Sequence, residues 1–116
     1  MGTNPRYQNG TLRRKYRQRM KAIGAPCGIC GGKLGAIHYD EPSDSKHPLS
    51  FVIDEIIPIS KAERHGYASA RAAAEDYNNL QAAHYICNQL KGNKENFSLK
   101  GNHKAVQKIN LSDGEW

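Results

Sequence analysis

Two pairs of metal-binding side chains, each with two residues between its members, stand far apart in the sequence. Cys27 and Cys30 form the first pair, and His84 and Cys87 form the second. Each pair can hold one ion from one side, and together they supply the four nitrogen and sulfur ligands of a tetrahedral structural zinc. Because 53 residues separate the pairs, the pattern predicts a zinc site that cross-links two distant segments.

Other interpretations of these four residues stay open. Cys27 and Cys30 have the spacing of a redox dithiol, although such a pair usually precedes a helix in a βαβ unit. The glycines around them are typical of the tight turns of a metal-binding knuckle. His84 and Cys87, taken alone, would more often be ordinary core residues. Only ligation accounts for the whole set.

An acidic strand lies between the two pairs and could serve a second cation. Asp54 and Glu55 follow the β-prone run 51–53, and Pro58 ends it. Asn88 comes directly after Cys87, within an expected helix.

The elements that must position these residues follow from local patterns. We expect a helix from Thr11, as its N-cap, to Ile23, ended by Gly24 and Pro26. Its apolar residues recur at intervals of three and four and predict one packing face: Leu12, Tyr16, Met20 and Ile23. The other expected elements are a polar loop at 40–48, a strand from 51 to 58, a short helix within 68–74, a strand at 80–83 and a helix at 84–91 stopped by Gly92. Residues 96–116 show no persuasive pattern.

Charge is distributed unevenly along the chain. Residues 1–24 hold seven Arg and Lys and no acid, residues 25–90 hold five against eight acids, and residues 91–116 hold five against three. A basic arm beside an acidic centre fits a protein that clamps a polyanion around a cation-binding pocket. A solvated basic helix without any ligand explains the arm equally well.

Size and composition limit the classes of protein that remain. The 116 residues form one small domain with extensions, for which a metal cross-link is a valuable substitute for core. No run reaches the roughly 18 apolar residues that a membrane span needs, and no apolar block follows the N-terminus as in a secretory signal. We therefore expect a soluble, cytoplasmic protein with no membrane partner and no organic cofactor.

The ordered set of these motifs resembles the HNH endonuclease family, especially its small phage-type members with a cysteine-rich zinc site. The resemblance runs from about Cys27 to Lys94, and its parts are Cys27 and Cys30, Asp54–Pro58, Asn79–Gln81, His84, Cys87, Asn88 and Lys91. It implies an α+β fold with a ββα-metal (His-Me finger) core, stabilised by the structural zinc and preceded by the basic helix. The implied division is a helical arm at 1–24, a nuclease core at 25–95 and a tail at 96–116.

The resemblance also implies residue roles. Asp54 and Asn88 match metal-ligand positions of the catalytic cation, Mg²⁺ or Mn²⁺, which grips the scissile phosphate. Asn79 matches an asparagine that orients the loop carrying the general base. Glu55 departs from the pattern, because most family members have histidine there as the base.

The role of Glu55 has several interpretations. It could be the general base itself, although a glutamate is a weaker proton acceptor than a histidine by about 3 kcal/mol. It could bind or position a metal-bound water. A histidine from elsewhere (His38, His47 or His65) could supply the base instead, or Glu55 could be a solvated acid at a strand end.

Phosphate contacts are expected from Arg13, Arg14 and Arg17 of the arm and from Lys91 and Lys94 at the end of the core helix. Such contacts would position double-stranded DNA without reading its sequence. The leading hypothesis is thus a divalent-metal DNA endonuclease, in a bacterial cell or a phage-infected host, and phage packaging proteins are partners only by analogy with the family. The alternatives are a zinc-stabilised DNA-binding module with weak or no catalysis, and a small adaptor whose basic arm and Trp116-ended tail bind proteins.

Overall fold

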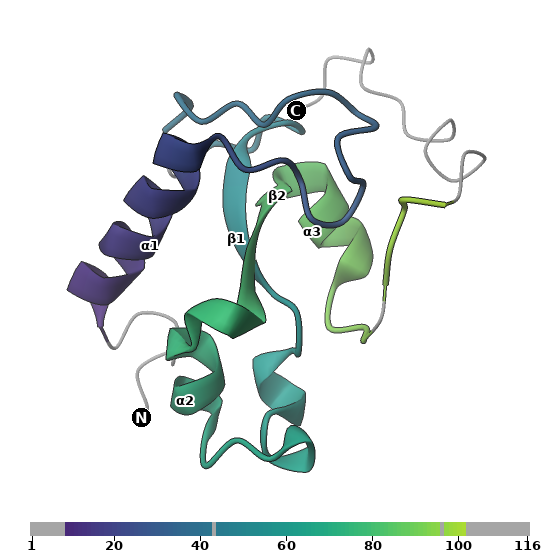
Figure 1. The fold of residues 1–116 in the computed structure, drawn as a ribbon. Coiled ribbons are helices and arrows are strands. Elements are labelled where there is room, and N and C mark those ends of the chain that lie inside the picture. The colour runs from purple at the N-terminus through teal and green to yellow at the C-terminus, as the bar shows by residue number, and fades with distance from the viewer. Residues whose placement is uncertain (1–8, 43, 96, 102–116) are drawn as a thin grey trace.

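The computed structural model describes residues 9–42, 44–95 and 97–101 and shows a small α+β domain. At its centre, β1 (Phe51–Glu55) and β2 (Leu80–His84) form an antiparallel sheet of two strands, with Phe51 opposite His84 and Glu55 opposite Leu80. α3 (Tyr85–Lys91) follows β2 directly and packs on both strands. In Figure 1, α1 (Gly10–Ile23) and α3 stand on either side of the strand pair.

α1 begins at Gly10, and its N-cap is Asn9. The expectation that Thr11 is the N-cap is therefore wrong. The Asn9 side chain accepts a hydrogen bond from the main-chain N–H of Leu12 at 3.0 Å, and asparagine is a strong N-cap residue because it satisfies an otherwise unpaired donor. The helix ends where expected, at Gly24, which adopts a left-handed conformation (φ 61°) that glycine reaches without steric cost.

The packing face of α1 is shorter than its apolar pattern indicates. Met20 is buried, and the Tyr16 hydroxyl donates to the main-chain oxygen of Glu75 at 2.6 Å while its ring packs on Tyr77. Ile23, by contrast, is 67% exposed, because the chain turns away at the helix end before this side chain reaches the core. The expected face therefore stops one turn earlier.

The chain between the two strands carries three short 3₁₀ turns (Ile59–Lys61, Glu63–His65 and Tyr77–Asn79) and one helix, α2 (Ala70–Glu75). α2 starts later than the expected 68–74 because Ser69 is its N-cap and accepts from the N–H of Ala72 at 3.1 Å. β1 ends at Glu55 and does not continue to Pro58, because Asn79 takes the hydrogen bonds of the next two residues.

The core lies between the cysteine knuckle, the inner face of the sheet and α3. Its buried members are Met20, Cys27, Ile29, Cys30, Ile37, Phe51, Ile53, Leu80, Ala82, Ala83, Ile86, Cys87 and Leu99. Leu99 belongs to the segment expected as a tail, yet its N–H donates to the main-chain oxygen of Ile29 at 2.9 Å. Within the described part of the chain, no helix is long and apolar enough to cross a membrane.

Candidate functional site

The four expected zinc ligands meet in one buried cluster. The ligand atoms of Cys27, Cys30, His84 and Cys87 all lie within 4.8 Å of one another, and each residue is at most 1% exposed. The Nδ1 atom of His84 is 3.4 Å from the Cys30 sulfur and 3.8 Å from the Cys87 sulfur. The grouping of three cysteines and one histidine that the spacing predicts is confirmed.

The surroundings of the cluster suit a bound cation. The His84 Nε2 atom lies 3.4 Å from the carbonyl oxygen of Ala36, so a proton on Nε2 leaves Nδ1 free to bind a metal. The main-chain N–H groups of Cys30 and His84 approach the Cys27 sulfur at 3.5 and 3.4 Å. These donors stabilise a thiolate, which is the form of cysteine that binds zinc.

Hydrogen bonding among the thiols also indicates that the cluster suits a bound cation. The pKa of the Cys27 thiol is lowered to about 3, first by a hydrogen bond from Cys87 and then, against the opposing effect of burial, by His84 and Cys30. The pKa of Cys87 is raised because its proton is held by Cys27 and because it is buried. A buried thiolate needs a compensating charge, and the donor set of three sulfurs and one nitrogen fits structural zinc.

A cleft of about 850 Å³ lies beside the sheet and contains the expected acidic site. Its lining comes from α1, β1, α3 and the residues that follow β1 and α3, and it includes Arg13, Arg14, Arg17, Asp54, Glu55, Asn88 and Lys91. Residues from three segments far apart in sequence therefore face one space. Asn79 does not line the cleft, and neither does Lys94.

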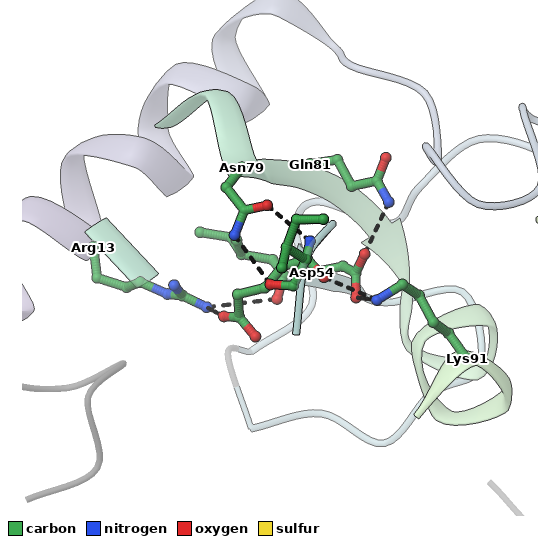
Figure 2. A network of polar contacts seen from close by, with 8 residues as sticks. Arg13, Asp54, Asn79, Gln81 and Lys91 are labelled. Carbon is green, nitrogen blue, oxygen red and sulfur yellow. Dashed lines mark hydrogen bonds and ion pairs between the residues drawn. The ribbon is translucent and has the colours of Figure 1, made fainter. Parts of the chain in front are cut away.

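Asp54 is buried at the end of β1 and holds two donors. Its Oδ1 pairs with the Lys91 ammonium at 3.1 Å, and its Oδ2 accepts from Gln81 Nε2 at 2.8 Å (Figure 2). Burial raises the pKa of the Asp54 carboxyl, while Gln81 and then Lys91 oppose that shift. Each oxygen retains a lone pair beyond these contacts, so the carboxylate still fits a cation ligand.

Lys91 departs from its expected role as a phosphate contact. It is 2% exposed, and its ammonium also donates to the main-chain oxygen of Glu55 at 2.8 Å. Since α3 packs against β1, position 91 faces the end of the strand and not the solvent. The lysine therefore neutralises Asp54 from inside the protein.

Glu55 points to α1. Its Oε2 accepts from the Arg13 guanidinium at 3.2 Å, and the same guanidinium nitrogen is 3.5 Å from the main-chain oxygen of Ile53. The other terminal nitrogen of Arg13, Nη1, is buried and has no partner among the described residues. The two carboxylates of β1 thus face different cations, Lys91 on α3 and Arg13 on α1.

Asn79 organises the segment that follows Glu55. Its side-chain oxygen accepts from the N–H of Ile57 at 2.7 Å, and its side-chain nitrogen donates to the main-chain oxygens of Ile57 at 3.1 Å and Ala73 at 3.2 Å. Its main-chain oxygen accepts from Ile56 at 2.8 Å. Asn79 therefore fixes the backbone just after β1, while Asn88 is half-buried and lines the cleft.

The other basic residues differ in their availability. Arg14 is exposed and lines the cleft, and the Arg17 guanidinium lies 4.4 Å from the centre of the Phe51 ring. The pKa of Arg17 is lowered by burial and then by the neighbouring charge of Arg13. Lys94 contacts the Phe97 ring and the main-chain oxygen of Leu90, away from the cleft.

None of the three histidines considered as alternative bases lies at the cleft. His38 and His47 stack on each other beside Glu41, and His65 pairs with Glu95 at 3.0 Å. Among the residues that the structure describes, no histidine lines the cleft that holds Asp54. Its acidic lining residues are Asp54 and Glu55.

The zinc knuckle touches the acidic site through Gln81, a contact that the sequence analysis missed. A Cβ atom on Gly28 would lie 2.0 Å from Gln81 Oε1, and the Gly28 N–H donates to the main-chain oxygen of Ala82 at 2.8 Å. Gln81 is also the cross-strand partner of Asp54. The strand pairing was the available signal, because partners in an antiparallel pair face the same side.

Comparison with known proteins adds no relative: no protein-family profile, no curated protein and no solved structure matches this chain.

Proposed function

We propose that this chain is an HNH-type nuclease with a ββα-metal core that hydrolyses phosphodiester bonds of double-stranded DNA with the help of a divalent cation. The observation that carries the proposal is the cleft in which Asp54, Glu55 and Asn88 meet the arginines of α1. The order of strand, strand and helix around it supports the same assignment, as does the cysteine-rich cluster that joins the segments.

Binding would rest on α1. Arg13, Arg14 and Arg17 follow one another at helical spacing along the cleft wall, and guanidinium groups bind phosphate oxygens through two parallel hydrogen bonds. Contacts of this kind act on the DNA backbone, so affinity would fall steeply with salt and depend little on sequence.

Hydrolysis would rest on the strand end and α3. Asp54 and Asn88 would hold Mg²⁺ or Mn²⁺, which supplies charge neutralisation at the phosphate and the leaving oxygen when bound. Glu55 would accept the proton of the attacking water. Arg13 would hold the Glu55 carboxylate in place before DNA enters, and Asn79 would fix the segment that follows.

Conversion of supercoiled plasmid tests this function. The zinc-loaded protein with Mg²⁺ or Mn²⁺ should produce nicked or linear DNA, and EDTA applied briefly should stop the reaction. The Asp54→Asn variant keeps the size of the side chain and should lose cleavage at every metal concentration. Wild-type cleavage by that variant would remove the cleft from the mechanism.

A second candidate is a DNA-binding module without catalysis. The observation in its favour is that protein cations already pair with both carboxylates of β1, Lys91 with Asp54 and Arg13 with Glu55. Such a protein would shift DNA in a binding assay with the same salt dependence but leave plasmid supercoiled with every divalent metal.

A further inference from the structure

A second group of metal-binding side chains lies outside the zinc centre and outside the cleft. His38, Glu41 and His47 each place one ligand atom within 4.8 Å of the others. The two imidazole rings stack with their centres 4.8 Å apart, and His38 Nδ1 is 3.8 Å from Glu41 Oε1. His38 is exposed, and the other two are half-buried, so solvent ions reach the group freely.

The backbone holds the two histidines side by side before any ion arrives. His38 forms a bridge with Ser50, and its N–H donates to the main-chain oxygen of Leu49 at 2.8 Å. The Ser50 hydroxyl donates to the main-chain oxygen of His47 at 2.8 Å. Because these bonds fix the two Cα positions, only side-chain rotations are needed to bring the ligand atoms together, which lowers the entropic cost of binding.

The ligand types select the class of ion. Two imidazole nitrogens and one carboxylate oxygen suit zinc, cobalt, nickel or copper, whereas Mg²⁺ and Ca²⁺ prefer sets made of oxygen alone. Three protein ligands also leave coordination positions open to water, unlike the closed set at the zinc centre. We propose that His38, Glu41 and His47 form a second, solvent-accessible site for a divalent first-row transition metal.

One hydrogen bond must change when the site is filled. His47 Nδ1 now accepts from the N–H of Leu49 at 3.1 Å, so in a neutral ring the proton sits on Nε2. A metal on Nε2 moves that proton to Nδ1, and a metal on Nδ1 takes its lone pair. Either way the Leu49 N–H loses its acceptor, so this amide reports occupancy of this particular site.

The bound ion would join two segments that lead into the sheet. Glu41 and His38 follow the cysteine knuckle, and His47 comes four residues before β1 begins at Phe51. The ion would therefore close the loop between knuckle and strand. This site is independent of the proposed nuclease function, because none of its ligands lines the cleft.

Cobalt titration of the zinc-loaded, full-length protein tests the proposal. Cobalt that displaced zinc from the thiolates would give intense sulfur-to-cobalt charge-transfer absorption in the near-ultraviolet, whereas cobalt in a site of nitrogen and oxygen ligands lacks that absorption. We compare wild type with His38→Ala, His47→Ala and Glu41→Gln, and use His65→Ala as the matched control, since His65 is a histidine that pairs with Glu95 elsewhere.

The wild type should bind one cobalt beyond its zinc, with the amide signal of Leu49 shifting in step. Affinity should fall about tenfold or more in each histidine variant, fall less in Glu41→Gln, and stay unchanged in His65→Ala. Glu41→Gln keeps the side-chain size, so it remains informative if a histidine variant folds poorly. Cobalt affinity that is equal in wild type and His38→Ala, or cobalt binding that leaves the Leu49 signal in place, would overturn the proposal.

Discussion

The ammonium of Lys91 lies 3.1 Å from Asp54 Oδ1, and both side chains are 3% exposed. This buried ion pair joins the last turn of α3 to the end of β1, the two elements that would hold the catalytic cation. Lys91 also donates to the main-chain oxygen of Glu55, so one side chain contacts the Asp54 carboxylate and the backbone of the next residue. Lys91 therefore fixes the Asp54 carboxylate and the end of β1 from inside the protein.

Replacement of Lys91 should destabilise the protein strongly. Lys91→Met keeps most of the side-chain volume but leaves the Asp54 carboxylate buried without its cation, which costs about 3–5 kcal/mol. Urea unfolding of the zinc-loaded protein measures the loss. Lys94→Met, which changes a lysine outside the cleft, is the matched control and should stay within about 0.5 kcal/mol of wild type. A Lys91→Met protein as stable as that control would show that the pair contributes nothing.

Gly28→Ala should disturb Asp54 through Gln81. The added methyl group would overlap the Gln81 amide, and overpacking of this kind costs about 1–3 kcal/mol. In a Gln81→Ala background the space is free, so the same substitution should cost much less. Denaturant unfolding of the wild type, Gly28→Ala, Gln81→Ala and the double variant gives the coupling free energy between positions 28 and 81.

Gly101→Ala is the matched control for that cycle, because nothing lies within 4 Å of the corresponding Cβ and its backbone is unstrained. If Gly28→Ala lowered the free energy of unfolding equally in the wild type and in Gln81→Ala, overlap with the Gln81 amide could not be the cause.

Removal of zinc should unfold the domain. The cluster closes a long loop, and metal-binding energy becomes folding energy when the ligands are dispersed in the unfolded chain. We expect a strong chelator to abolish the cooperative unfolding transition seen by circular dichroism and added zinc to restore it. Acidification should weaken zinc binding, because protons compete for the thiolates and the histidine. A chelated, zinc-free protein that still unfolds cooperatively would disprove the structural role.

DNA affinity should depend on the arginines of the cleft and not on Lys94. Arg14→Gln and Arg17→Gln should each reduce the slope of log affinity against log salt by about 0.9, the value for one lost phosphate contact. Lys94→Gln should leave the slope unchanged, since Lys94 lies away from the cleft. Fluorescence anisotropy with a short duplex measures these slopes. If Lys94→Gln reduced this slope as much as Arg17→Gln does, the DNA would have to bind on another surface.

Part of this site could be predicted from sequence because its signals are local. The spacing of Cys27 and Cys30, and of His84 and Cys87, follows from the geometry of a knuckle and a helix start, so the zinc cluster needed no tertiary information. The end of β1 was not predictable in the same way, because Asn79, from 22 residues further on, takes the hydrogen bond of Ile57.

The contacts that depend on packing were missed for a physical reason. From the sequence alone, Lys91 would be predicted to lie on the surface. It is buried because α3 packs on β1 with this side chain turned inward. The sequence likewise gives no partner for Arg13, although its guanidinium pairs with the Glu55 carboxylate and so joins α1 to the sheet. Sequence indicated which residues carry charge, while the partners of those charges are set by the fold.

The Glu55→Gln variant tests the central claim most directly. Glutamine keeps the shape of the side chain and an oxygen that can accept from Arg13, but it cannot take a proton from water. In a supercoiled-plasmid assay with Mg²⁺ or Mn²⁺, cleavage should fall at least about 100-fold relative to wild type, while zinc content and DNA affinity stay the same. Cleavage by Glu55→Gln at the wild-type rate would contradict the account.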